Sequence, residues 1–131
     1  MNGTSTTERT FPAEPSALTE IRGFLRRWAA EARLDARATE DLVLAVSEAC
    51  ANAVLHSGSD YVEVIFATHE DAVEVEVRDR GRFHRRVRMT ELDGPGGYGI
   101  PLMMALTDQV VIREGTDDRP GTSVRLVKRR P

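Results

Sequence analysis

Residues 44–56 have the sequence LAVSEACANAVLH, inside a longer segment, 39–57, in which apolar residues recur at helical spacing. The apolar positions share one face of the expected helix: Leu42, Val46, Ala49 and Ala53. Glu48 and Asn52 are four residues apart, so they lie one turn from each other on another face. The pattern predicts a helix with one side in the core and a polar row, continued by His56, beside it.

Signals for helix ends occur on both sides of this segment. Thr39 is expected to be the N-cap, and Gly58 is well placed for the left-handed conformation that often ends a helix. Pro15 and Ser16 mark the start of an earlier helix. The apolar residues of that helix are also spaced by three or four: Leu18, Ile21, Leu25, Trp28 and Ala32.

Beyond Gly58 the apolar pattern changes to the two-residue period of strands. The expected strands are 61–68 and 72–78, then 109–113 and 122–127, with a short extended piece at 9–13. A short helix is expected at 99–106. The intervening 79–97 shows no periodicity and holds five arginines. Short turns within each strand pair indicate antiparallel hairpins.

This order of elements predicts an α/β two-layer sandwich (α+β), with a mostly antiparallel mixed sheet and the helices on one face. Alternating strand–helix units are absent, so a doubly wound dinucleotide-binding fold is not expected. A chain of 131 residues suits one core. We expect residues 1–8 to be a flexible N-terminal tail and 9–131 to form the single domain.

The composition excludes several classes of protein. Apolar residues make up 40% and charged residues 30%, as in an ordinary globular domain. The 18 Lys and Arg against 21 Asp and Glu give a net charge of −3, which argues against direct nucleic-acid or acidic-membrane binding. One cysteine and no apolar run of membrane-spanning length lead us to expect a cytoplasmic protein.

The polar row of the central helix is a candidate for chemistry. An Asn amide oxygen such as that of Asn52 is a hard ligand that suits Mg²⁺, and a carboxylate one turn away, Glu48, can accept a proton from a hydroxyl. Taken alone, such a pair is more often the solvated polar face of an amphipathic helix. Cys50 points away from both and is expected to be a packing residue.

Three weaker signals follow in chain order. Asp79-Arg-Gly81 comes where a strand ends, and a carboxylate there can accept a hydrogen bond from an exocyclic amine. Glycines 96, 97 and 99 precede or open a helix, where backbone N–H groups can hold phosphates. Gly121-Thr122 opens the last strand. Each is weak alone, but their ordered combination with Glu48 and Asn52 is specific.

In that combination the chain resembles the Bergerat-fold ATPases, the superfamily of gyrase-type ATPases and histidine-kinase catalytic domains. Within it, the chain looks like the anti-sigma-factor serine/threonine protein kinases of bacteria. Residues 44–56 resemble the N-box, VRDRG at 77–81 the G1 box, and GYGIPLMM at 97–104 the G2 box. The likeness covers nearly the whole chain from Arg9 onward.

The resemblance implies roles for the matching residues. Glu48 would be the general base for a target serine or threonine, and Asn52 would hold the Mg²⁺ that bridges the ATP phosphates. The remaining residues would bind the nucleotide: Asp79 the adenine amine, Gly81 and Thr122 the base pocket, and Gly97 and Gly99 the lid hinge and phosphate site.

The resemblance also implies partners: a sigma factor, an anti-sigma-factor antagonist as phosphorylation substrate, and a second copy in a homodimer. Two other functions stay open. One is a non-catalytic partner-binding module with a vestigial nucleotide site, and the other is a histidine-kinase-type catalytic domain. No P-loop sequence occurs, and the histidines have no zinc-site spacing.

Overall fold

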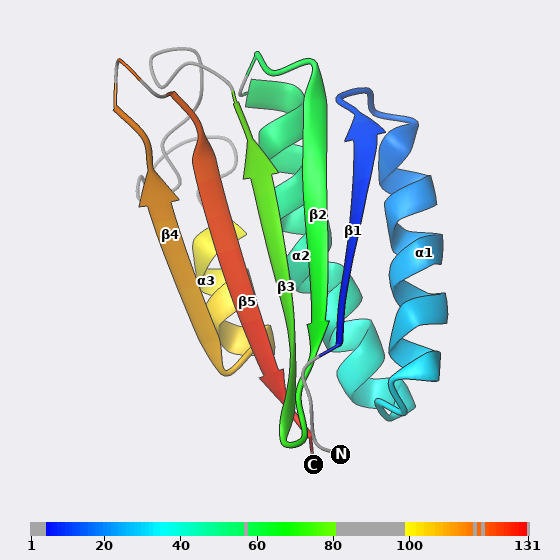
Figure 1. Ribbon diagram of the computed structural model, residues 1–131. Coiled ribbons are helices and arrows are strands. Elements are labelled where there is room, and N and C mark those ends of the chain that lie inside the picture. Colours follow the sequence, from blue (N-terminus) through cyan, green and yellow to red (C-terminus); the bar gives the residue numbers. More distant parts are fainter. Residues whose placement is uncertain (1–4, 57, 81–98, 117, 119, 131) are drawn as a thin grey trace.

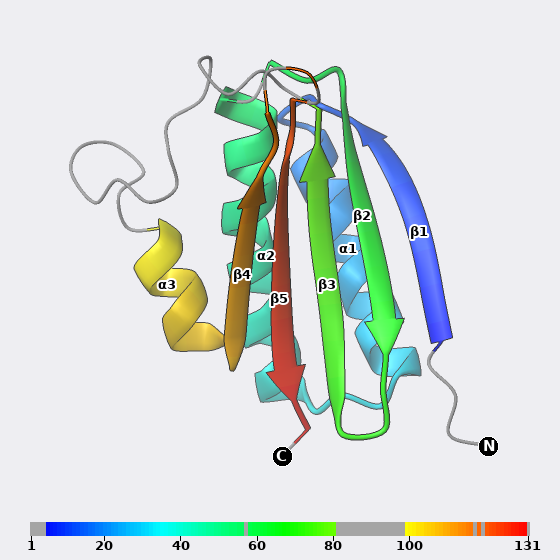
Figure 2. The ribbon, with the colours of Figure 1, turned by 60° about the vertical axis from the view of Figure 1, so that its left-hand side comes forward.

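The computed structural model describes residues 5–56, 58–80, 99–116, 118 and 120–130. Within them, three helices cover one face of a five-stranded sheet, which confirms the predicted two-layer α/β architecture (Figure 1, Figure 2). The elements in chain order are β1 (Ser5–Pro12), α1 (Ala17–Glu31), α2 (Ala36–His56), β2 (Tyr61–Thr68), β3 (Ala72–Asp79), α3 (Gly99–Leu106), β4 (Gln109–Glu114) and β5 (Thr122–Arg129).

The sheet has the strand order β1-β2-β3-β5-β4, and all four described strand pairs are antiparallel. Alternate residues of each inner strand face the helices and form the core with the apolar stripes of α1 and α2. The strands contribute Val62, Val64, Phe66, Val73, Val75, Val77, Val124 and Leu126, and the helices Ile21, Leu25, Leu42, Val46 and Met103. One continuous core therefore joins the two layers.

Two sequence predictions are corrected at the N-terminal side of the fold. Residues 5–8 are not a tail, because they belong to β1 and pair with the outer edge of β2, Glu8 opposite Ile65. Their side chains are exposed, so this part of the strand has no apolar alternation that could predict it. Backbone hydrogen bonds to β2 hold it in the sheet. Residues 1–4 lie outside the described part.

The cap of α2 is the second correction. The helix begins at Ala36, and the Oδ1 of Asp35 accepts a 2.7 Å hydrogen bond from the N–H of Ala38. Thr39 is already inside the helix, where its Oγ1 donates to the Asp35 carbonyl at 2.7 Å. Asp35 takes the cap because its carboxylate reaches the third helical N–H. At the other end Gly58 has the predicted left-handed conformation, with φ of 73°.

None of the described helices is long and apolar enough to cross a membrane.

Candidate functional site

Helix α2 carries the predicted general base, Glu48, and the predicted Mg²⁺ ligand, Asn52, away from its core stripe. Glu48 and Asn52 are both half-buried. In the part of the chain that the structure describes, neither side chain has a hydrogen-bond or ion-pair partner. Polar groups in partly dehydrated positions are normally paired, so an unpartnered pair one turn apart is suited to a ligand that the chain itself does not supply.

Cys50 lies between these two residues in sequence but points into the core, as predicted. Its side chain is fully buried, and this burial raises the pKa of the thiol to about 12. The guanidinium of Arg22, whose Nε donates to Ser47 Oγ at 2.9 Å, opposes that rise but is outweighed. Cys50 is therefore an inert packing residue on the core side of α2.

Asp79 and Thr122 meet where β3 ends and β5 begins. They are opposite each other in the antiparallel register, and both are buried, with exposed fractions of 7% and 5%. Asp79 lies two residues after the core residue Val77, and Thr122 lies two residues before the core residue Val124, so both are on the face of the sheet that is covered by the helices. A buried carboxylate opposite a buried hydroxyl is therefore a polar position at the end of an otherwise apolar face of the sheet.

The end of α2 lies at the same end of the molecule as Asp79 (Figure 1). The helix ends at His56, β2 begins at Tyr61, and the next residue, Val62, is opposite Asp79 in the sheet. The last turns of α2, which include Asn52, therefore approach the strand ends from the helix side. We call this end of the molecule the site end.

Gly121 shows why the start of β5 has its particular sequence. Its φ is +145°, and a Cβ atom at this position would lie 2.6 Å from the backbone oxygen of Asp79. Its carbonyl also accepts a 2.7 Å hydrogen bond from the N–H of Gly115, which closes the β4–β5 hairpin. Only a residue without a side chain lets β5 begin this close to Asp79. From sequence, Gly121-Thr122 is only a weak signal at the start of the last strand.

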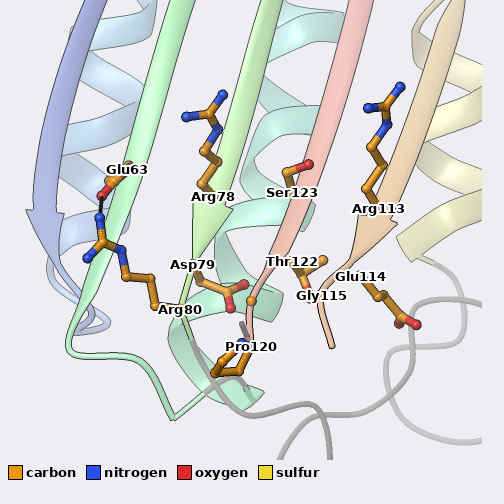
Figure 3. A pocket seen from close by; sticks show the side chains of 11 residues that line it. Glu63, Arg78, Asp79, Arg80, Arg113, Glu114, Gly115, Pro120, Thr122 and Ser123 are labelled. Carbon is orange, nitrogen blue, oxygen red and sulfur yellow. Dashed lines mark hydrogen bonds and ion pairs between the residues drawn. The ribbon is translucent and has the colours of Figure 1, made fainter. Parts of the chain in front are cut away.

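A cavity of about 400 Å³ opens at the same strand ends (Figure 3). Asp79 and Thr122 border it, and Arg80 reaches back over the open face of the sheet to Glu63, with 3.2 Å between Nη2 and Oε1. Glu48 does not line this cavity. The hollow belongs to the open side of the sheet, whereas the predicted pair lies on the helix side, so we do not assign the cavity to the candidate site.

Helix α3 brings the predicted Gly99 to the site from a third direction. Its far end is fixed by Lys128, whose Nζ donates to the Leu106 carbonyl at 2.8 Å and to Asp41 Oδ2 at 3.2 Å. Because α3 runs opposite to α2, its first residue, Gly99, lies toward the site end (Figure 2). The buried Met103 packs α3 onto the core between these ends.

The described residues thus include five of the seven predicted site residues. Asp79 and Thr122 lie at the strand ends, Asn52 in the last turns of α2, Glu48 one turn earlier, and Gly99 at the start of α3. Gly81 and Gly97 lie outside the described residues, so their predicted roles stay predictions. Residues 5–56, 58–80, 99–116, 118 and 120–130 contain no cluster of three His, Cys, Asp or Glu side chains placed to hold a metal ion. A cation here would need ligands beyond the protein carboxylates, and phosphate oxygens and water fit Mg²⁺.

Comparison with known proteins identifies the family of this chain. Residues 11–128 match the histidine kinase-like ATPase domain family. The chain is 34% identical to the serine-protein kinase RsbW of Bacillus velezensis and 33% identical to that of Bacillus subtilis, in each case over 92% of this chain and 83% of the relative.

A solved structure adds the same result for the fold. The structure of the RsbU and RsbW domains of Rv1364c from Mycobacterium tuberculosis superposes with a TM-score of 0.74 and 26% identity. The match covers 97% of this chain, which spans about a third (33%) of that longer chain. By sequence and by fold, this chain belongs to the histidine kinase-like ATPase domain family, together with the RsbW serine-protein kinases.

Proposed function

We propose that this chain binds Mg²⁺-ATP and transfers the γ-phosphoryl group to a serine or threonine of a partner protein, as an anti-sigma-factor kinase. The observation that carries the proposal is the half-buried pair Glu48 and Asn52, without a partner among the described residues, on the helix that ends at the same end of the molecule as the buried Asp79. The serine-protein kinase names of the relatives support the choice of acceptor.

In this proposal the strand ends hold the base of the nucleotide. The Asp79 carboxylate accepts a hydrogen bond from the adenine amine, and Thr122, its register partner, lies beside it. Gly121 keeps the two strand ends close together. Gly81 completes the base pocket, and Gly97 and Gly99 provide backbone N–H groups for the phosphates.

Asn52 and Glu48 have the two remaining roles, metal binding and proton transfer. The amide oxygen of Asn52 fits as the protein ligand of Mg²⁺, which neutralises charge on the phosphates when it is bound. The hydroxyl oxygen of the acceptor serine or threonine bonds to the γ-phosphorus, and the bond from that phosphorus to ADP breaks. Glu48 accepts the proton that the hydroxyl loses. The bonding pair leaves with ADP. A base must have a free acceptor oxygen, and Glu48 has one among the described residues.

The partners follow from the same family relationship. We propose that the chain binds a sigma factor, phosphorylates an antagonist that competes for it, and forms a homodimer. In this proposal the chain regulates transcription in the cytoplasm through these protein partners, and neither nucleic acid nor membrane is a direct partner.

Calorimetric titration of ATP tests the nucleotide site. We expect Mg²⁺-dependent binding that weakens about 10–100-fold in Asp79→Ala, because a charge-assisted hydrogen bond is lost. Asn52→Ala should remove most of the Mg²⁺ dependence. Absence of ATP binding in the parent chain would contradict the proposal and favour a binding module. Acid-labile instead of acid-stable phosphate on a substrate would favour histidine-kinase chemistry.

A further inference from the structure

The outward face of α2 is unusually poor in charge. Between residues 42 and 55, Glu48 is the only charged residue. A helix face that meets only water normally carries several charged side chains. The core stripe explains the apolar residues on one side of α2, but it leaves those on the opposite side without an explanation.

These outward residues form a line along the helix. Leu44, Glu48, Ala51 and Leu55 are spaced by four, three and four residues, so they lie within an arc of about 60°. Leu44 is 47% exposed and Leu55 is 59% exposed. We call Leu44, Ala51 and Leu55 the α2 seam, and Glu48 is the one charged group within it.

Three of the four exposed large apolar side chains of the described structure belong to the helix layer. The four are Leu44 and Leu55 on α2, Met104 on α3, which packs against α2, and Tyr61 on β2. The open face of the sheet is different, because its strands place paired charges there, such as Arg78 with Glu76 and Arg125 with Glu74. The paired charges suit the open sheet face to contact with water, whereas the apolar side chains of the α2 seam do not.

We propose that the α2 seam is the docking surface for the phosphoacceptor protein, which presents its serine or threonine between apolar side chains. This inference rests on the proposed function, since a base acts only on a hydroxyl within about 3 Å. An acceptor segment that reaches Glu48 must therefore cross the seam. One helical turn is about 5.4 Å, close to two residues of an extended segment, so residues about two positions from the hydroxyl meet Leu44 and Ala51.

The test compares Leu44→Glu/Leu55→Glu with Tyr61→Glu. Glutamate keeps the helix propensity of leucine, and Tyr61 is an equally exposed apolar side chain, at 61%, away from the seam. The probes are two pools of serine peptides, one with apolar and one with charged residues on either side of the serine. Phosphotransfer from labelled ATP, peptide binding by fluorescence anisotropy, ATP affinity by calorimetry and mass by light scattering are measured for each protein.

We expect the parent chain to prefer the apolar pool about tenfold or more. The double variant should lose that preference because its KM for the apolar pool is raised, while kcat and ATP affinity are unchanged. Tyr61→Glu should behave as the parent. Equal use of both pools, an equal loss in Tyr61→Glu, or loss of ATP binding in the double variant would overturn the proposal. A parent dimer that becomes monomeric only in the double variant would assign the seam to a second copy.

The anisotropy measurement separates this inference from the proposed function. A parent chain that binds ATP but phosphorylates neither pool contradicts phosphotransfer. The seam is still supported in that case if apolar peptides bind the parent and not the double variant. If neither pool binds the parent chain, the docking surface is wrong, whatever the outcome for ATP.

Discussion

The two ends of this molecule treat polar groups in opposite ways. At the far end, Lys128 pairs with Asp41 and the last carbonyl of α3, and Arg130 Nη1 donates to the Ala32 carbonyl at 2.7 Å. At the site end, the half-buried side chains of Glu48 and Asn52 have no partner among the described residues. The far end uses its polar groups to hold the helices on the sheet, whereas Glu48 and Asn52 leave their polar atoms available, among the described residues, for a ligand.

The largest effect that this comparison predicts is on activity alone. Glu48→Gln keeps size and hydrogen-bonding ability but removes the base, so phosphotransfer should fall about 10²–10⁴-fold. ATP affinity should be unchanged, and thermal stability should be equal or higher because an unpaired carboxylate is removed. Single-turnover transfer and thermal unfolding check this. Transfer at the parent rate would show that Glu48 is not the base.

Gly121→Ala tests the backbone of the site end. The added methyl group would meet the Asp79 oxygen at 2.6 Å, so we expect a loss of about 1–3 kcal/mol in unfolding free energy together with weaker ATP binding. Gly23→Ala is the matched control, because its Cβ would lie 3.7 Å from Arg27 and the helix would gain about 0.5–1 kcal/mol. Equal stability of the two variants in urea would contradict the close approach.

Lys128→Met tests the far end, where we expect an effect on stability and not on ATP binding. It leaves the Asp41 carboxylate and the Leu106 carbonyl without their shared donor, in positions where Lys128 is 18% and Asp41 31% exposed. We expect about 1–2 kcal/mol of lost stability and little change in ATP affinity. Lys128→Arg should recover part of the stability. A loss of ATP binding without loss of stability would show that the two ends are not separate in function.

Most of the fold was predictable because its signals are local. The bounds of β2 and α3 follow from alternation and helical spacing, and both are confirmed. The strand formed by residues 5–8 was not predictable, since its exposed side chains carry no pattern and its partner, β2, is more than 50 residues away. The Asp35 cap was missed because Thr39 and Asp35 are both good cap residues, and only the position of the first helical turn decides between them.

The positions of Glu48 and Asn52 on α2 were predictable, but the surroundings of the candidate site were not. Spacing alone put Glu48 and Asn52 on one face of a helix, and neither side chain has a hydrogen-bond or ion-pair partner among the residues that the structure describes. The close approach of Gly121 to Asp79 depends on β5 lying beside β3, a contact between distant segments that no local pattern contains. The exposure of Leu44 and Leu55 likewise required knowing which side of α2 faces the sheet.

The smallest predicted effect is on the pH dependence of the unfolding free energy. It arises from Cys50, on the core side of α2, and is absent at neutral pH. Burial raises the pKa of the Cys50 thiol to about 12, against about 9 for an exposed thiol. Between these values the native state holds a proton that the unfolded state has lost, so unfolding free energy should fall as pH rises from about 9 to about 12. Cys50→Ala should remove this component of the pH dependence. At neutral pH the thiol should react with iodoacetamide only after unfolding, because the buried thiol is neither ionised nor accessible. Rapid alkylation of the native chain would show that α2 does not present one side to the core and the other to a ligand.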